Sequence, residues 1–314
     1  MLENVPEGEA ARIDRIVELT GMQMQRRYGA AGKPFLRGVH AKGHGCAAAT
    51  LEVLPDLPEH LRRGLFATPG RKFEAVVRFS NADPLVRPDS TPGANGAPPS
   101  HGSRGMAIKV KGAEGPMLGP ALYAAEQDFL MVNQPVFAFA NVEDYEVLSR
   151  VLQEDNDDAK RFFVERLPPP GTTAPSPSQL RARETGLLVA RVRSPGMTAV
   201  PPAFQVPPAS PLENDYFGAA PFLFGPDQVM RYRARATLVP GAPPDVADPD
   251  YLRQALVKRL SDAAQGPVVF HFEAQIRPAA SIDPEADIEN ASHGWAADVP
   301  FEPLAMLTIP PQEI

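Results

Sequence analysis

The chain of 314 residues has little cysteine, no long apolar run and no strongly basic segment. Its single cysteine, Cys46, excludes an intrachain disulfide, which agrees with a reducing compartment. No apolar stretch approaches the length of a bilayer-spanning helix, and the polar segment 1–10 lacks the pattern of a signal peptide. The basic residues are scattered in a chain of net charge −7, which disfavours nucleic acid as a partner. We therefore expect a cytoplasmic protein with neither a membrane nor a nucleic-acid partner.

Proline is abundant, with 37 residues beside 24 glycines. The prolines gather in four segments that we expect to be long surface loops: 84–103, 168–178, 201–211 and 240–249. Loops of this length are often functional, but variable surface insertions explain them equally well. The sequence contains no internal repeat.

Strand-like and helix-like patterns alternate between these loops. The expected strands span 47–54, 73–79, 106–110, 129–132, 187–192, 229–239, 268–276 and 304–309. The expected helices span 9–27, 58–66, 142–152, 157–166 and 248–264, with Asn141 and Asp248 as N-caps. The arginines at 231, 233 and 235 share one strand face, which we expect to meet water. Many antiparallel strands with helices between them predict an α+β fold with a barrel or sandwich at its centre.

Two short segments carry a charged or titratable residue inside a strand-like run. The first, RGVHAKG, places His40 three residues after Arg37, and the second, VRFSN, places Arg78 in an apolar strand. A charge at such a position needs a partner. Arg37 and Arg78 together could hold a pair of carboxylates, or each could form a salt bridge with an acidic residue elsewhere.

His40, His44 and Cys46 form a string that suggests a metal site, but the spacing argues against one. Residues four apart on an extended strand are separated by about 13 Å, which is too far for shared ligation unless the chain bends at Gly43 and Gly45. The other four histidines are better explained as surface residues or satisfied polar groups: His60, His101, His271 and His293.

Four segments in order make the sequence resemble the haem-containing catalase family, and most closely its small, core-only, catalase-like peroxidases. They are RGVHAKGHG at 37–45, VRFSNAD at 77–83, SRGMAIKVKG at 103–112 and DFLMVNQPVF at 128–137, with a looser match over 288–314. The resemblance implies an antiparallel β-barrel core with surrounding helices, in one domain spanning 1–314. That domain would hold an N-terminal helix in 1–30, the first barrel half with the distal site in 31–140, and helices, long loops and the second barrel half in 141–314.

The resemblance also implies a set of catalytic residues on the distal side of a haem. His40 matches the distal histidine and Ser80 matches the serine that hydrogen-bonds it. The distal asparagine of the family falls at Val132, so Asn133 is the nearest asparagine that could take its role. The implied chemistry is proton transfer by a neutral His40 on hydrogen peroxide or an organic hydroperoxide.

The cofactor implied by the resemblance is haem b. Arg37 and Arg78 match the arginines that hold its propionates, Val39 packs over its face, and Phe137 is an aromatic residue beside it. The family's axial ligand is a tyrosine with an arginine four residues earlier, and this sequence contains no such pair. An alternative alignment puts Phe224 at the tyrosine position, so the metal ligand stays unassigned.

Three readings follow from the missing tyrosine. The first is a haem-dependent peroxidase or catalase-like enzyme that forms a homodimer, as its small relatives do. The second belongs to another class: a protein of catalase fold that has lost haem and binds a small molecule or a partner. The third is a haem enzyme for organic or lipid hydroperoxides, since a core-only chain lacks the segments that narrow access in large catalases.

Overall fold

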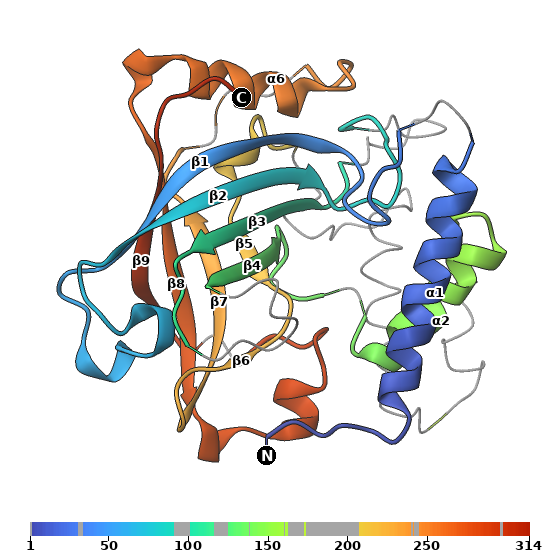
Figure 1. The fold of residues 1–314 in the computed structure, drawn as a ribbon, viewed down its shortest axis with the longest axis horizontal. Coiled ribbons are helices and arrows are strands. Elements are labelled where there is room, and N and C mark those ends of the chain that lie inside the picture. The colour runs from blue at the N-terminus through green and yellow to red at the C-terminus, as the bar shows by residue number, and fades with distance from the viewer. Residues whose placement is uncertain are drawn as a thin grey trace.

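The centre of the molecule is an antiparallel β-barrel (Figure 1). The structure is a computed structural model that describes residues 2–30, 34–90, 101–115, 125–137, 139–159, 161–162, 173, 207–239, 241, 245–295 and 298–314. Its strands are β1 Gly43–Val53, β2 Lys72–Asn81, β3 Arg104–Lys111, β4 Glu126–Val132, β5 Tyr216–Gly218, β6 Phe222–Leu223, β7 Gln228–Ala236, β8 Val268–Pro278 and β9 Phe301–Ile309. Among these, the order β5-β4-β3-β2-β1-β9-β8-β7 closes through pairing of β5 with β7, while β6 adds a short hairpin to β7. The predicted α+β fold with a barrel core is confirmed.

Alternation of side chains along the strands fills the barrel. In β8 the apolar residues Val268, Phe270, Phe272 and Ala274 are fully buried, as the period of two predicts. Aromatic rings from neighbouring strands pack on one another inside, with Phe129 and Phe272 centroids 4.7 Å apart. Closure removes the exposed strand edges that an open sheet would present.

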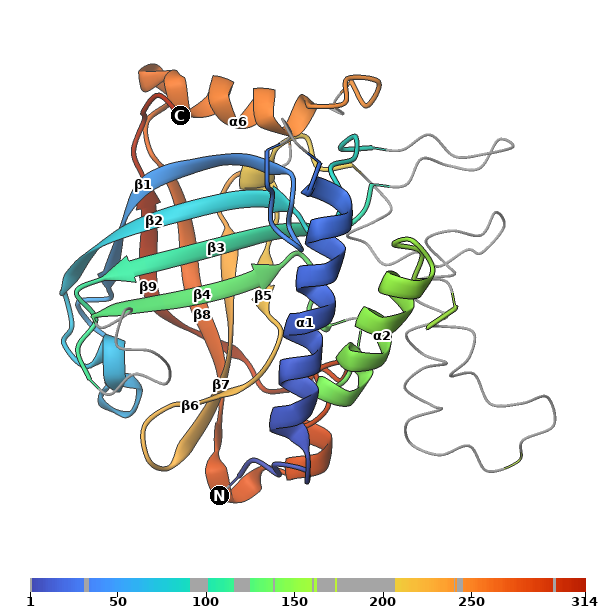
Figure 2. The same ribbon diagram turned by 45° about the vertical axis from the view of Figure 1, so that its right-hand side comes forward.

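Three α-helices lie outside the barrel in the described part of the chain: α1 Glu9–Tyr28, α2 Val142–Glu154 and α6 Tyr251–Ser261. Helices α1 and α2 lie side by side at the ends of strands β1 to β4, and α6 crosses one end of the barrel (Figures 1 and 2). The Asn141 side chain accepts from the Asp144 amide at 3.0 Å, which confirms this N-cap. No described helix combines the length and apolar character needed to cross a bilayer.

Several expected elements differ from the observed ones. Segment 58–66 forms two short 3₁₀ turns, η1 Glu59–Leu61 and η2 Gly64–Phe66, because Gly64 adopts a positive φ of 51° that a helix cannot continue through. Helix α6 begins after Asp250, whereas we expected a helix from Asp248. In the segment expected to form a helix at 157–166, Asp157 lies in a turn. The rest of the helix expected at 157–166 falls largely outside the described residues, as does the whole strand expected at 187–192.

The β7 arginines do not all face water. Arg231 is buried and donates to the carbonyls of His293 and Pro135, and Arg233 and Arg235 both pair with Glu273 on β8. The alternation was predicted correctly, but the chain beyond β8 covers one of the three guanidiniums.

Candidate active site

His40 lies in the segment that connects helix α1 to strand β1. Its backbone has a φ of 53°, in the left-handed region that histidine tolerates better than most residues. Nη2 of Arg78 on β2 donates to the His40 carbonyl at 2.7 Å, and Oγ of Ser80 lies 3.0 Å from the ring Nδ1. Strand β2 therefore fixes both the backbone and the ring of His40.

The ring of His40 occupies the place of a missing side chain on β3. Gly105 pairs directly with Ser80, and a Cβ at position 105 would lie 2.4 Å from the ring Cε1 and Nδ1. Any other residue at 105 would collide with the imidazole. The glycine in the SRGMA segment thus makes room for His40 on the outer face of the barrel.

Burial and two arginines keep His40 neutral. Burial lowers its pKa to about 4, with further contributions from the charges of Arg78 and then Arg37. The pKa of Arg78 is itself lowered, first by burial and then by the charge of Arg37. Neither arginine forms an ion pair with a carboxylate among the described residues, so the alternative of a salt bridge to an acidic residue is not seen there. Two mutually repelling cations favour an anion between them.

The outer face of strands β1 to β4 carries small or apolar side chains around Arg78. Strand register puts Cys46, Arg78, Ala107 and Leu130 in one row. Cys46 is exposed and the Leu130 side chain is 66% exposed, so no described segment covers this row at either end. Next to it, toward the loop, stand Ser80, Gly105 and Val132 with the His40 ring. Small and apolar side chains beside unpaired cations suit a planar apolar group that carries carboxylates.

The remaining predicted residues lie at the margins of this face. Val39 is 46% exposed. Val132 pairs with Gly105 in the same row as His40, whereas the Asn133 Oδ1 accepts from the Arg104 amide at 2.7 Å. The Asn133 Nδ2 is buried and has no hydrogen-bond partner among the described residues. Phe137 packs edge-on against Phe139 at 4.4 Å between centroids. The structure therefore brings together His40, Ser80 and the two arginines, and turns the Asn133 oxygen toward the β3 backbone.

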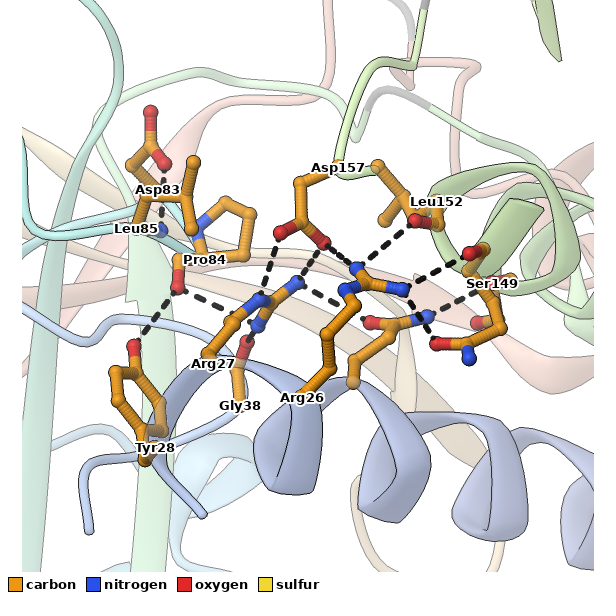
Figure 3. A network of polar contacts seen from close by, with 12 residues as sticks. Arg26, Arg27, Tyr28, Gly38, Asp83, Pro84, Leu85, Ser149, Leu152 and Asp157 are labelled. Atoms are coloured by element: carbon orange, nitrogen blue, oxygen red, sulfur yellow. Dashed lines mark hydrogen bonds and ion pairs between the residues drawn. The ribbon is translucent and has the colours of Figure 1, made fainter. Parts of the chain in front are cut away.

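A polar network holds the loop between α1 and β1, which carries His40, against the helices (Figure 3). The sequence analysis did not predict this network. Arg27 of α1 donates to the Gly38 carbonyl at 2.9 Å and forms a buried ion pair with Asp157 at 2.5 Å. Arg26 binds the same carboxylate at 2.6 Å. Gly38 packs so closely on α1 that a Cβ would lie 2.7 Å from the Thr20 methyl. Only the tertiary fold joins these residues, so no local sequence signal could have identified them.

A second buried network secures the start of β1. Asp89 accepts from Lys42 at 2.8 Å, from the Asn81 amide at 3.0 Å and from the Leu252 amide at the start of α6 at 3.0 Å. Asp89 therefore caps α6 from a distant loop, in place of the expected Asp248. His44 joins through Asn81 at 2.9 Å, and burial lowers its pKa to about 4.

The string His40, His44 and Cys46 does not converge on one point. His44 is fully buried in the Asp89 network, His40 lies over Gly105, and Cys46 is exposed on the outer face. Within the described residues no group of three metal-ligating side chains gathers anywhere.

No described tyrosine forms a hydrogen bond or a ring contact with His40 or Arg78. Phe224, the alternative ligand position, is buried against Phe66 with centroids 6.2 Å apart. The tyrosines in the barrel core or at the start of α6 are buried, and those on α1 and α2 contact a carbonyl or an aromatic ring: Tyr216, Tyr232, Tyr251, Tyr28 and Tyr145. The described part of the chain thus places Ser80 and Arg78 against His40, with no tyrosine bonded to any of the three.

The fold is similar to that of solved catalases. A bacterial catalase superposes with a TM-score of 0.55 at 17% identity, covering 88% of this chain and 49% of its own. A fungal catalase gives 0.56 at 15% identity over 88% and 50%, and catalase A from Saccharomyces cerevisiae gives 0.58 at 13% over 89% and 52%. The chain therefore has a catalase-like fold and spans about half the length of these proteins. No sequence-family profile matches it, and no curated protein matches it.

Proposed function

We propose that this protein is a haem-dependent peroxidase of the small catalase-like branch, acting on hydrogen peroxide or an organic hydroperoxide. The observation that carries the proposal is the neutral imidazole of His40, bonded to Ser80 above an apolar face with two unpaired arginines. The catalase-like fold supports it.

The side chains on and beside the outer face of β1 to β4 support haem b as the ligand through their charge and apolar character. Arg37 and Arg78 would hold the propionates, because neither has a carboxylate partner among the described residues. Val39 and Phe137 would contact the edge or face of the ring, and Ala107 leaves space for a plane to lie on the strands. Bound haem would supply the electrons that cleave the O–O bond.

His40 would move the proton. With Nδ1 donating to the Ser80 Oγ, Nε2 carries a lone pair and makes no hydrogen bond to a described residue. A base with a pKa of about 4 is neutral at working pH, so Nε2 accepts the proton of the hydroperoxide O–OH and returns it to the departing oxygen. Asn133 would support this site by joining the end of β4 to the start of β3, because its Oδ1 accepts from the Arg104 amide.

The second candidate function is a haem-free protein of catalase fold that binds a small carboxylate or a partner. The observation that favours it is that no described tyrosine forms a hydrogen bond or a ring contact with His40 or Arg78. Such a protein would keep the two arginines as its anion site and leave His40 without a reaction.

The His40→Ala variant separates the two candidates. Since acid–base groups typically contribute about 100-fold or more, we expect peroxide reduction to fall by at least that factor while haem content is retained. The exposed His60 supplies a matched control, His60→Ala, which should keep full activity. Haem-loaded His40→Ala with unchanged activity would contradict the assigned role, and protein that takes up no haem would favour the second candidate.

A further inference from the structure

Asp89 is an almost fully buried carboxylate, 1% exposed, in the loop that follows β2. Its Oδ1 lies 2.8 Å from the Lys42 ammonium and accepts from the Asn81 side-chain amide at 3.0 Å. Its Oδ2 accepts from the Leu252 backbone amide at 3.0 Å. Donors on both oxygens, one of them a cation, hold this carboxylate in a single position.

Lys42 connects the buried carboxylate to the segment that carries His40. It follows His40 by two residues, and its ammonium also lies 2.8 Å from the Asp250 carboxylate and donates to the Pro249 carbonyl. The backbone carbonyl of Lys42 accepts from the Asn81 amide at 3.0 Å. The chain just after His40 is therefore held both by a side chain and by its backbone.

Asn81 connects the same carboxylate to Ser80. Asn81 is the next residue on β2, so its side chain points to the opposite face of the strand. The Asn81 amide oxygen accepts from Nη1 of Arg104 at 2.8 Å and lies 2.9 Å from Nε2 of His44. With the bond to Asp89, these contacts fix the end of β2, and a shift of Ser80 would disturb them.

The two partners of the His40–Ser80 hydrogen bond are thus attached to one oxygen atom. Lys42 reaches it from the His40 side and Asn81 from the Ser80 side. The bond between the imidazole and the hydroxyl is 3.0 Å long. Since hydrogen bonds weaken beyond about 3.2 Å, a small displacement of either segment would weaken this one.

We infer that Asp89 is a positioning residue for the proposed acid–base chemistry, because it holds the segment after His40 and the end of β2 where the imidazole meets Ser80. Among the described residues, no hydrogen bond or ion pair joins Asp89 to His40 or Ser80. Its influence on them therefore passes through Lys42 and Asn81. The catalytic part of the inference rests on the proposed function, whereas the geometry can be measured without haem.

The first measurement is the His40 pKa in the 314-residue chain before haem is added. Without the Asp89 carboxylate the ring should leave Ser80 and its buried position, so the pKa should rise from about 4 by about one unit or more in Asp89→Ala. Asp89→Asn keeps an oxygen for Lys42 and Asn81 and should produce a smaller rise. The His40 signal in ¹H–¹⁵N NMR spectra is the one missing from His40→Ala.

The second measurement is peroxide reduction by haem-loaded protein, with hydrogen peroxide as the substrate and guaiacol as the reductant. A misplaced His40 should lose part of the roughly 100-fold contribution of an acid–base group, so kcat should fall about tenfold or more in Asp89→Ala. The KM should change less than about twofold, because Asp89 is buried on the opposite side of β2 and does not touch the substrate. Asp89→Asn should recover part of the loss.

Asp144→Ala is the matched control. Asp144 is also a buried carboxylate, 5% exposed, but it lies at the start of α2, where its Oδ2 accepts from the Ala140 amide at 3.0 Å. This variant should lose stability, as Asp89→Ala does, and keep the wild-type His40 pKa and kcat. Asp89→Asn preserves the shape of the side chain and decides the question where Asp89→Ala does not fold.

The outcomes separate the inference from the proposed function. A His40 pKa that stays near 4 in the Asp89 variants, or that rises equally in Asp144→Ala, overturns the inference alone. A shifted pKa with a wild-type kcat overturns it as well. Haem-loaded wild type that reduces no peroxide overturns the proposed function, and the catalytic role of Asp89 with it.

Discussion

At the scale of single residues, the site depends on how His40 is held. Its positive φ is an uncommon conformation for a side-chain-bearing residue, and such strain persists only where surrounding contacts maintain it. Those contacts come from Arg78 at the carbonyl, Ser80 at the ring and Gly105 beneath the ring. Each of these three residues lies in one of the sequence segments that resemble the catalase family. The contact between Gly105 and His40 could not be predicted, because it depends on the register of β2 and β3.

Gly105→Ala should drive the His40 ring away from Ser80. A Cβ 2.4 Å from two ring atoms leaves no room for the imidazole, so the ring should move toward water and its pKa should rise from about 4 toward its ordinary value. Overpacking at this position should also lower the free energy of unfolding by about 1–3 kcal/mol. A pH titration of the imidazole by ¹H–¹⁵N NMR measures the pKa directly.

Gly21→Ala supplies the control for this substitution. Gly21 lies on the exposed side of α1 with nothing within 4 Å of an added Cβ, so the His40 pKa should not change. Stability should rise by about 0.5–1 kcal/mol, since alanine favours a helix over glycine. A His40 pKa that stays near 4 in Gly105→Ala would contradict the packing described here.

At the scale of elements, apolar periodicity and capping residues predicted most of the observed helices and longer strands. Helix α1, the α2 cap at Asn141 and the alternation of β8 followed from periodicity and capping. The short strands β5 and β6 were missed, because three and two residues give no periodic signal. The capping of α6 by Asp89 was missed for another reason: the cap comes from a residue far away in sequence.

Arg27 connects the pair of helices α1 and α2 to the loop that carries His40. This guanidinium ties the Gly38 carbonyl to Asp157, with side-chain exposures of 5% and 7% for the ion pair (Figure 3). A buried ion pair need not add net stability, but removal of one partner leaves an uncompensated buried charge. The loop of His40 is therefore sensitive to residues that make no contact with the ring.

Asp157→Ala should destabilise the protein by about 3 kcal/mol, because Arg27 stays buried without its carboxylate. In the wild type the Ala41 amide donates to the Asp83 carbonyl at 3.2 Å. In the variant the loop should open more often, so hydrogen exchange of this amide should become faster. Chemical denaturation and hydrogen-exchange NMR measure the two effects. In the exposed pair Arg15 and Glu18, Arg15→Gln should change stability by less than about 0.5 kcal/mol. Equal effects of the two variants would contradict the role given to Arg27 and Asp157.

At the scale of the whole molecule, His40, Ser80 and Arg78 lie on one outer face of a closed barrel. Side chains fill the barrel interior, so the proposed cofactor would lie on the outside, where β2 carries Arg78 and the segment before β1 carries Arg37. The chain spans about half the length of the catalases whose fold it shares. The sequence motifs pointed to His40, Ser80 and Arg78, which the structure brings into contact, whereas no motif indicated an axial ligand.

Addition of haem to the purified 314-residue chain tests the central claim most directly. We expect a saturable Soret band at one haem per chain, and an affinity at least about tenfold weaker in the Arg37→Gln/Arg78→Gln variant, since each charge-assisted contact with a propionate is worth more than 1 kcal/mol. Arg253→Gln, which removes a guanidinium bonded to the His44 carbonyl, should bind haem as the wild type does. A chain that shows no Soret band at any haem concentration, or a double variant that binds haem as tightly as the wild type, would contradict the account.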